Sequence, residues 1–475
     1  MNVPSKIFDL AVIGAGPGGY VSAIYAAQLK AKVALIEKWE IGGVCLNVGC
    51  IPTKVLASAA HTLESTRKGE DWGLKVGHLN LDFKQLAKRK ELTVKRLTGG
   101  VKNLLKSNGV ELFSAEASFI PPVAGFIDQQ TLKLKYGDGK EEKLEAKRII
   151  IATGSVPIKL SIPGNDLEGV IDSTGALNLD EVPKSMVIIG GGYIGCEFAS
   201  IYRSFGTEVT IVEMLPQILP GEDDEMATTL RKILEKRGIR ILTDSKVSRI
   251  NPSEENRKKV IVQTKEGDKE ILCDKVLVSV GRRAYTEGLG LDAVGIKHDK
   301  GRILVDKYLR TNLPHIFAVG DCIGNYLLAH VASMEGEIAV ENAILNRNEE
   351  MDYSCVPRCI FTLPELASVG ISEKEARDRS LKIKVGKFPF LANGKAQAEN
   401  EAEGLVKIIT DESGKILGGH ILGNRATDLV AELTLGMKNG ISARDFIETI
   451  HAHPTLPEAI REAFLKLEDR PLHIL

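Results

Sequence analysis

The most regular feature of the chain is a short apolar run that ends in a glycine-rich turn. Residues 8–13 read as a buried strand, glycine-rich residues 14–19 follow at once, and an alanine-rich helical stretch comes next. A second apolar run, residues 32–36, ends at Glu37, 23 residues after Gly14. In a βαβ unit of this kind the helix N-terminus binds a pyrophosphate and the acid binds ribose hydroxyls. The pattern predicts dinucleotide binding, rather than a purely structural turn, through Gly14, Gly16, Gly19 and Glu37.

The same plan returns in the middle of the chain. Residues 186–189, 190–195 and 209–212 repeat it, and Glu213 again lies 23 residues after its first glycine. Two fingerprints imply two dinucleotides, and the expected pair is one FAD and one NAD per chain. NADP is disfavoured because residues 214–221 contain no Arg or Lys to pair with a 2′-phosphate. The predicted NAD-binding residues of this unit are Gly190, Gly192, Gly195 and Glu213.

Closing strands indicate how the domains are organised. Apolar runs at residues 148–154 and 275–281 follow the two units, and residues 316–321 have the form of a strand returning to the first domain. Residues 110–147 alternate in polarity, which predicts an antiparallel excursion around Pro121 and Pro122. We predict an α/β fold with two Rossmann-like dinucleotide-binding domains, in which the NAD domain is inserted in the FAD domain.

The C-terminal part contains no third fingerprint. An apolar strand at residues 405–409 and an amphipathic helix at residues 428–438 predict a separate α+β dimerisation domain. The predicted boundaries are residues 1–152 for the first part of the FAD domain, 153–281 for the NAD domain, 282–352 for the second, central part of the FAD domain and 353–475 for the dimerisation domain.

The composition is that of a folded globular protein. The 475 residues are 43% hydrophobic and 26% charged, and the net charge of -1 supplies no field that attracts nucleic acid. The longest purely apolar stretches, such as residues 149–152, are far below the roughly 18 residues of a membrane span. Residues 1–6 lead into no long apolar region of a secretory signal. We expect a cytoplasmic protein, or a mitochondrial matrix protein if the chain is a processed organellar one, without nucleic-acid or membrane partners.

Two cysteines lie in a glycine-rich loop after the first unit. Cys45 and Cys50 belong to residues 42–54, in which Pro52 opens a helical pattern. Such a pair can close a small disulfide ring at a helix N-terminus, where amide dipoles stabilise a thiolate. Two free buried thiols are the alternative, and no His or Cys pair with metal-ligand spacing lies nearby. A place beside a predicted flavin domain favours redox chemistry.

Several motifs together resemble one family. The loop at residues 42–54, the two fingerprints, Ala152-Thr153-Gly154, residues 318–321 and residues 451–458 are similar, in order and over essentially the whole chain, to motifs of the pyridine nucleotide-disulphide oxidoreductases. Within that family the chain most resembles the dihydrolipoamide dehydrogenases, although Val44 stands where Thr is commonest. The resemblance implies a homodimeric flavoenzyme, the E3 component of 2-oxo acid dehydrogenase complexes or of the glycine cleavage system. Its implied partners are the lipoyl domain and subunit-binding domain of E2, or the glycine cleavage H protein.

The resemblance also implies roles for residues around the cysteine pair. Cys45 would be the outer sulfur that exchanges with the dithiol, and Cys50 the inner sulfur beside the flavin. Lys54 would lie by the flavin and pair with Glu197, which would lie near the nicotinamide. Both could instead be solvated helix charges.

Further cofactor contacts are implied at the ends of strands and helices. Tyr193 would cover the flavin where the nicotinamide enters, or be a packed aromatic residue. Asp321 would bind the ribityl chain, or be a turn residue, and a helix beginning near Ala329 would point its N-terminus at the flavin ring. The predicted cofactor-binding set is completed by Thr153, Gly154 and Gly281, at the ends of the two closing strands.

The last motif contains a histidine and an acid. By resemblance His453 is the catalytic base and Glu458 the acid that orients it. Residues 455–458 also read as a capping box, so Glu458 could merely cap a helix, and His451 is expected to be structural. Cys355 and Cys359, if both lie in an extended strand, are about 13 Å apart and beyond disulfide reach.

Other functions share this architecture. A glutathione reductase would need basic residues after Glu213, and mercuric and large thioredoxin reductases carry a thiol pair near the C-terminus, whereas no cysteine follows Cys359. Flavin transhydrogenases of this shape lack the complete loop pair. A non-catalytic flavoprotein redox sensor would keep both fingerprints but turn over lipoamide negligibly. Oxidation of protein-bound dihydrolipoamide with reduction of NAD is the expected function.

Overall fold

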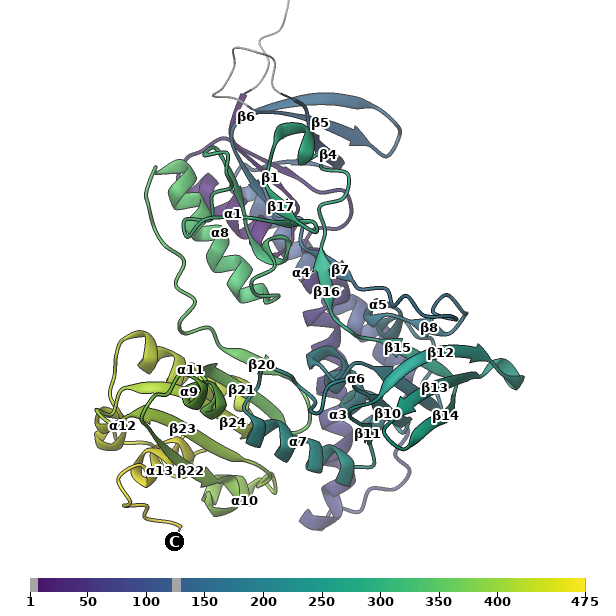
Figure 1. Cartoon of the computed structure of the whole chain (residues 1–475), viewed down its shortest axis with the longest axis vertical. Coiled ribbons are helices and arrows are strands. Elements are labelled where there is room, and N and C mark those ends of the chain that lie inside the picture. Colours follow the sequence, from purple (N-terminus) through teal and green to yellow (C-terminus); the bar gives the residue numbers. More distant parts are fainter. Residues whose placement is uncertain (1–6, 122–129, 475) are drawn as a thin grey trace, which may run out of the picture. The chain divides into compact units, whose positions relative to one another are not determined.

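Figure 1 shows the computed structural model, which describes residues 7–121 and 130–474. The prediction for residues 1–6, and Pro122 of the predicted excursion, lie outside the described residues. The chain forms two compact units, which are treated separately. Unit 1 comprises Met1–Val55, Lys84–Ile158 and Gly281–Met351, and unit 2 comprises Leu56–Phe83, Lys159–Val280 and Asp352–Leu475.

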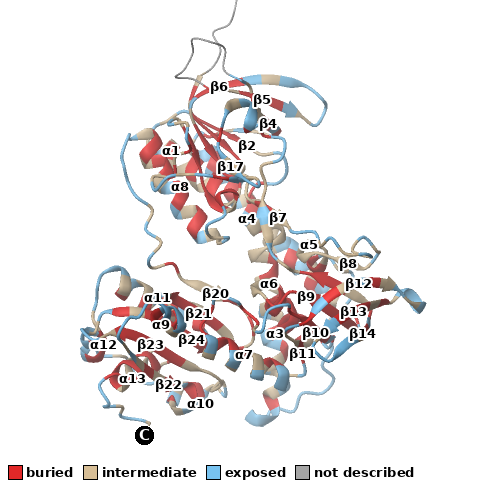
Figure 2. Cartoon of the chain, in the orientation of Figure 1, coloured by how far each residue is buried: buried red, intermediate tan, exposed pale blue. Residues whose placement is uncertain are grey.

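Unit 1 is built on a seven-stranded sheet in the order β3-β2-β1-β6-β5-β4, with β19 also paired to β6. Its strands are β1 (Ile7–Ile13), β2 (Val33–Ile36), β3 (Glu111–Phe113), β4 (Ala115–Phe119), β5 (Gln130–Tyr136), β6 (Glu141–Ile151) and β19 (Ile316–Ala318). Strands β1, β2, β3, β6 and β19 pair in parallel, whereas β4, β5 and β6 pair antiparallel. Both the returning strand and the antiparallel excursion are therefore confirmed. The central runs are apolar throughout because parallel strands are covered on both faces, as the burial in Figure 2 shows.

The helices of unit 1 pack against this sheet and against each other. They are α1 (Pro17–Gln28), α2 (Gly43–Val48) and α8 (Ala329–Ile344), and the division between the units falls within α3 (Cys50–Arg67) and at the start of α4 (Phe83–Ser107). Helices α1 and α8 approach closely, because a Cβ on Gly336 would lie 2.7 Å from the carbonyl oxygen of Gly18. The glycine is what permits that contact.

Within the described residues one helical stretch, Gly43–Trp72, is long and apolar enough to cross a membrane, and 28% of its most apolar window is buried. The stretch is not purely apolar, because it includes Lys54 and several small polar residues. The core helix of a globular protein meets the same criterion, so length and composition here are weak evidence for a span.

Unit 2 contains a second parallel sheet, in the order β11-β10-β9-β15-β8. Its strands are β8 (Val170–Ile171), β9 (Ser185–Ile189), β10 (Glu208–Val212), β11 (Arg240–Leu242) and β15 (Lys275–Val278), and its helices are α5 (Ser173–Leu177), α6 (Tyr193–Phe205) and α7 (Asp224–Lys236). An antiparallel sheet of β12 (Lys246–Pro252), β13 (Lys258–Thr264) and β14 (Gly267–Cys273) accompanies it. In unit 1 the chain leaves through β7 (Ser155–Pro157) and returns through β16 (Arg282–Ala284), which pair with each other. This pairing is the connection expected of an inserted domain.

The C-terminal part of unit 2 is an antiparallel sheet in the order β20-β21-β24-β23-β22. The strands are β20 (Arg358–Ile360), β21 (Glu365–Gly370), β22 (Ile383–Pro389), β23 (Leu405–Asp411) and β24 (Ile416–Gly423), with helices α9 (Glu373–Asp378), α10 (Gly394–Ala398), α11 (Ala426–Lys438), α12 (Ala443–Glu448) and α13 (Glu458–Lys466). The predicted strand at 405–409 and helix at 428–438 are confirmed within β23 and α11. The seven-stranded sheet of unit 1, the parallel sheet of unit 2 and its C-terminal antiparallel sheet together confirm the predicted fold class. The exact domain boundaries stay predictions.

A buried lysine joins the two parts of unit 2. Lys407 on β23 is 2% exposed at its side chain, and its Nζ lies 2.8 Å from Asp223, 3.1 Å from Glu225 and 2.7 Å from Glu373. Burial alone would raise the pKa of Asp223, but the hydrogen bond and charge of Lys407 hold it below its ordinary value. The cluster therefore stabilises the fold only while the carboxylates are ionised.

A Lys407→Met variant is expected to be destabilised by about 3–5 kcal/mol, because it removes the cation in contact with the buried carboxylate of Asp223. Urea unfolding measures the loss. The matched control Lys374→Met removes an exposed pair with Asp378 and should leave the urea midpoint near that of the wild type. Because the Asp223 pKa is lowered on folding, its contribution is present above the ordinary Asp pKa and is lost as the pH falls through the lowered value. Similar urea midpoints for the two variants at neutral pH would contradict this assignment.

Candidate functional site

The first glycine-rich turn lies between β1 and α1. A Cβ on Gly19 would lie 1.8 Å from the carbonyl oxygen of Gly14, so only glycine allows the helix to start so close to the strand. Gly16 has nothing within 4 Å of a built Cβ, which leaves its backbone open to a ligand. The Ala15 N–H donates to Glu37 Oε2 at 2.7 Å, so the acid at the end of β2 lies against the turn. The arrangement suits a phosphate at the N-terminus of α1.

Other predicted residues of unit 1 lie around this turn. A Cβ on Gly14 would meet Thr153 Cα at 3.2 Å, and Thr153 Oγ1 is buried without a hydrogen-bond partner among the described residues. Gly154 follows with a φ of 72°. An open glycine beside an unpartnered buried hydroxyl fits a polar ligand such as a dinucleotide, because a buried polar group normally has a partner.

Asp321 lies in a short 3-10 turn, Gly320–Ile323, after β19, and helix α8 begins at Ala329, as the resemblance implies. Asp321 accepts a hydrogen bond from Ser155 Oγ at 2.5 Å, and Arg282 Nε donates to the same hydroxyl at 2.7 Å. Partial burial raises the pKa of Asp321 above its ordinary value, although the Ser155 bond opposes the shift. The half-buried carboxyl thus also joins residues 166 positions apart, and its contact with a cofactor stays a prediction.

The second glycine-rich turn repeats this geometry in unit 2. A Cβ on Gly195 would lie 2.0 Å from the Gly190 carbonyl oxygen, and Gly192 is open. The Gly191 N–H donates to Glu213 Oε2 at 2.6 Å, as Ala15 does to Glu37. The two turns therefore offer the same kind of phosphate and ribose site. Gly281, at the other end of the predicted domain, has a φ of 119° and accepts a hydrogen bond from the Ile158 N–H.

The two cysteines are brought together by two consecutive helices. Cys45 lies in α2, and α3 begins at Cys50 after Gly49. The structure has both as thiols, and the Cys45 thiol is hydrogen-bonded to Cys50. That hydrogen bond, burial and the negative charge of a Cys50 thiolate together raise the pKa of Cys45, and the cation of Lys54 opposes the shift. Cys50 occupies the first position of α3, where the positive end of the helix dipole favours a thiolate.

His453 and Glu458 form a hydrogen-bonded pair before and at the start of α13. His453 Nδ1 lies 2.9 Å from Glu458 Oε1, and the imidazole side chain is 77% exposed. Glu458 Oε2 accepts the Thr455 N–H at 2.7 Å, so the acid holds both the histidine and the turn that precedes α13. Burial by itself raises the pKa of Glu458, but the Thr455 N–H and His453 hold it below its ordinary value. The N-cap of α13 is Pro457, which makes no side-chain cap bond, so the capping-box alternative is wrong, and the role of Glu458 in orienting a catalytic base stays a prediction.

Neighbouring histidines differ from His453. The His451 side chain is 6% exposed and bonded through Nε2 to Glu432, which agrees with its expected structural place. His473 pairs with Glu462 at 2.9 Å, one turn along α13 from Glu458. The sequence analysis missed this second pair, for which the only signal was the four-residue spacing of the two acids.

The first two turns of α6 carry Tyr193 and Glu197. Glu197 is 7% exposed, and its Oε1 accepts the Phe361 N–H at 3.0 Å, so the alternative of a solvated charge is wrong for this residue. The Tyr193 hydroxyl donates to Glu222 Oε1 at 3.3 Å. Glu222 and its partners Arg358 and Ser368 were not found from the sequence, because these two residues lie 136 and 146 positions from Glu222.

The remaining cysteines do not pair. Cys196, Cys273 and Cys322 are buried thiols. Cys355 and Cys359 are free thiols, as expected, although they do not share one strand: Cys359 lies on β20 and Cys355 lies in the turn before it. Within residues 7–121 and 130–474 no group of three or more His, Cys, Asp or Glu side chains could hold a metal ion.

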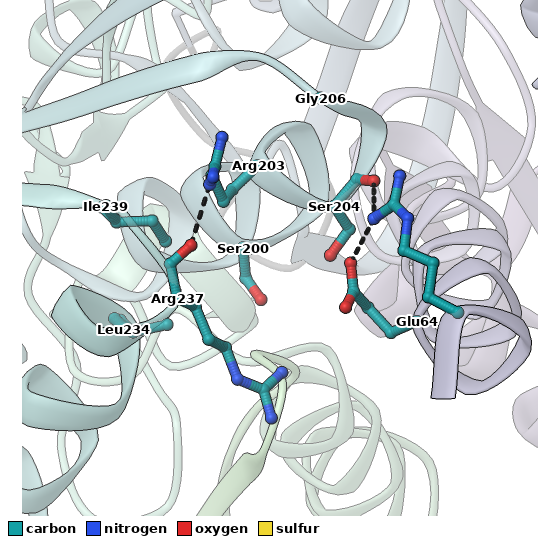
Figure 3. A pocket seen from close by; sticks show the side chains of 9 residues that line it. Glu64, Ser200, Arg203, Ser204, Gly206, Leu234, Arg237 and Ile239 are labelled. Atoms are coloured by element: carbon teal, nitrogen blue, oxygen red, sulfur yellow. Dashed lines mark hydrogen bonds and ion pairs between the residues drawn. The ribbon is translucent and has the colours of Figure 1, made fainter. Parts of the chain in front are cut away.

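A cavity of about 300 Å³ lies elsewhere in unit 2 (Figure 3). Its lining includes Arg67, Arg203 and Arg237 but none of the predicted site residues. Each of the three arginines already has a partner within the fold. The Arg67 guanidinium donates hydrogen bonds to Glu64 and to the Ser204 carbonyl oxygen, and Arg203 donates one to the Arg237 carbonyl oxygen. The side chain of Arg237 forms an ion pair with Glu403. We therefore place the functional site at the motifs and not in this cavity.

Comparisons with known proteins agree with these motifs. The family described as pyridine nucleotide-disulphide oxidoreductase matches residues 8–336, and the dimerisation domain of that family matches residues 356–464. A dihydrolipoyl dehydrogenase of Geobacillus stearothermophilus is 45% identical over 470 residues, which are 98% of this chain and 97% of that protein. One of Thermus scotoductus is 44% identical over 476 residues, 99% of each.

Two solved structures match the fold of nearly the whole chain at lower sequence identity. LpdA from Mycobacterium tuberculosis superimposes with a TM-score of 0.89 at 27% identity, over 96% of this chain and 99% of that one. The HOCl-induced flavoprotein disulfide reductase RclA from Escherichia coli, solved as a Cu(II) complex, gives a TM-score of 0.86 at 29% identity, over 97% and 99%.

Proposed function

The chain belongs to the pyridine nucleotide-disulphide oxidoreductase family, and from this we propose that it is a dihydrolipoamide dehydrogenase that oxidises protein-bound dihydrolipoamide and reduces NAD. The observation that carries the proposal is the contact between Cys45 and Cys50 at the N-terminus of α3. Two thiols this close can alternate between dithiol and disulfide with a substrate dithiol. The high identity to proteins named for this activity supports the choice of substrate.

The cofactor sites follow the two glycine turns. We assign FAD binding to Gly14, Gly16, Gly19, Glu37, Lys54, Thr153, Gly154, Asp321 and the start of α8 at Ala329. We assign NAD binding to Gly190, Gly192, Tyr193, Gly195, Glu197, Glu213 and Gly281. When bound, FAD would accept the electron pair of the reduced cysteines and NAD would receive it as a hydride.

The protein's own groups account for the exchange. His453, oriented by Glu458, takes a proton from one substrate thiol, and the thiolate attacks Cys45 Sγ of the oxidised pair. The Cys45–Cys50 bond breaks, and Cys50 leaves as a thiolate at the start of α3. The second substrate sulfur, after losing its proton, displaces Cys45 and closes the lipoyl disulfide. The substrate dithiol is thereby oxidised and the cysteine pair reduced by two electrons.

The proposal extends to assembly and place. We propose a homodimer through the domain at residues 353–475, because a dimerisation-domain model matches residues 356–464. Its partners would be the lipoyl and subunit-binding domains of E2, or the glycine cleavage H protein, in the cytoplasm. The domain boundaries at residues 152, 281 and 352 belong to the same proposal.

The test compares NADH-linked reduction of lipoamide, oxidised glutathione and Hg(II) by the flavin-loaded protein. Preference for lipoamide supports the proposal. Preference for glutathione or Hg(II) would move the chain to another branch of the family, and flavin binding without turnover of any of them would indicate a redox sensor.

Discrimination against NADP is expected from Glu213. Its carboxylate accepts the Gly191 and Leu215 N–H groups, and a 2′-phosphate would meet a negative charge that is held in place. We expect kcat/KM for NAD to exceed that for NADP by about 10²-fold or more, since like charges in contact cost several kcal/mol. Steady-state kinetics with both cofactors measures the ratio, and equal values would refute the assignment. A Glu213→Gln variant should lower the ratio of kcat/KM for NAD to kcat/KM for NADP.

A further inference from the structure

A buried carboxylate anchors the tyrosine at the start of α6. Glu222 lies in the loop between β10 and α7, and its side chain is completely buried. It accepts hydrogen bonds from three elements: Arg358 Nε of β20 at 2.9 Å, Ser368 Oγ of β21 at 2.6 Å, and the Tyr193 hydroxyl at 3.3 Å. None of these contacts belongs to the glycine fingerprint.

The anchor is rigid for an electrostatic reason. A buried carboxylate is costly unless it is paired and hydrogen-bonded, and here Arg358 supplies the charge and Ser368 the second bond. Arg358 Nη2 is buried without a partner in the described part of the chain, so Glu222 is the charge that compensates the buried guanidinium. Moving Glu222 would break the ion pair as well as the bond to Tyr193.

The same strand region contacts α6 in two further places. The Phe361 N–H donates to Glu197 Oε1, and the Leu363 N–H donates to Ser200 Oγ, each at 3.0 Å. The face of α6 that carries Tyr193 and Glu197 is therefore fixed by residues of the C-terminal domain. Burial and the charge of Glu222 raise the pKa of Tyr193 to about 12, so its hydroxyl stays a donor throughout the physiological range.

We propose that Glu222, held by Arg358 and Ser368, is a positioning residue that orders Tyr193 for nicotinamide binding. The inference rests on the proposed function, which places Tyr193 beside the nicotinamide. An ordered ring loses less conformational freedom when the ligand binds, so the anchor contributes to affinity. The C-terminal domain thereby affects nicotinamide binding from within its own subunit, besides its proposed dimer contact.

The test is a binding titration of the flavin-loaded, full-length protein with NAD and with ADP-ribose, which lacks the nicotinamide ring. Glu222→Gln keeps the size of the side chain and removes its charge. We expect it to raise the Kd for NAD by about three- to tenfold and to leave that for ADP-ribose unchanged. A general disturbance of the NAD domain would weaken both ligands equally and would overturn the proposal, as would an unchanged or lowered Kd for NAD.

Two double variants distinguish an effect on the position of Tyr193 from an effect on the stability of the fold. In a Tyr193→Phe background, Glu222→Gln should have no additional effect on the Kd for NAD, because no hydroxyl remains to be anchored. An undiminished effect in that background would refute action through Tyr193. Since Glu222→Gln leaves Arg358 without a counter-charge, the neutral pair Glu222→Gln/Arg358→Met should restore thermal stability while keeping the weakened NAD binding.

The matched control is Arg237→Gln. Arg237 pairs with Glu403 at 2.6 Å and so joins the same two parts of unit 2, but within the described residues it does not hydrogen-bond Tyr193 or Glu222. Its Kd for NAD should equal that of the wild type, and a rise equal to that of Glu222→Gln would argue against the proposal. None of these titrations uses lipoamide. A protein that failed to turn over lipoamide would therefore contradict the proposed function without changing the measured Kd values for NAD and ADP-ribose.

Discussion

A Cys45→Ser variant is expected to lose lipoamide turnover by at least about 10⁴-fold, because a hydroxyl cannot form the sulfur–sulfur bond that the exchange requires. The change replaces one atom in a helix-borne side chain that already hydrogen-bonds Cys50, so the fold and the glycine turns should remain. NADH-linked lipoamide reduction measures the loss. NADH oxidation by an artificial one-electron acceptor should persist, because it does not need the cysteine pair.

The matched control is Cys355→Ser, the same chemical change in a turn of unit 2. It should keep wild-type turnover. The order of the two sulfurs has its own readout, since a Cys50 thiolate beside bound flavin should give a long-wavelength absorption band in Cys45→Ser and none in Cys50→Ser. The opposite pattern would exchange the two roles, and normal turnover by Cys45→Ser would remove the pair from the mechanism.

A His453→Gln variant is expected to slow lipoamide turnover by about 10²- to 10⁴-fold, the usual loss when a general base is removed. The imidazole is exposed and bonded to Glu458 through Nδ1, which leaves Nε2 for a substrate proton. The control is His473→Gln, an exposed histidine paired with Glu462 on the same helix, which should retain activity. Equal losses in both variants would mean that α13, and not the base, was disturbed.

We propose that His453 acts on the cysteine pair of the other subunit, because its motif lies in the C-terminal domain and in neither dinucleotide-binding domain, and mixed dimers test this. Dimers that combine one His453→Gln chain with one Cys45→Ser chain contain one complete composite site if the site is shared between subunits. Such dimers should recover activity that neither parent shows. If enriched mixed dimers stay inactive, the base serves its own chain or is not the base.

Much of the fold could be predicted because its signals are local. A strand, a glycine turn and a helix directly follow one another, and the third glycine of each turn is required by a neighbour a few positions away, as Gly19 is by the Gly14 carbonyl. The start of α8 at Ala329 and the strands at β19 and β23 follow from the same short-range patterns. Periodicity predicts such elements because burial on a sheet depends on the alternation or continuity of apolar residues.

The sequence by itself therefore determined the two dinucleotide units, the cysteine loop, the histidine motif and the family they resemble. The tertiary structure decided which charges are paired. It showed that Glu458 contacts both His453 and the Thr455 N–H, that Glu197 is buried, and that Glu222, Arg358 and Tyr193 meet in one cluster. It also placed Lys407 among three carboxylates. These contacts join residues separated by up to 184 positions, and a buried charge is stable only when its distant partner arrives, which no local pattern of polarity encodes.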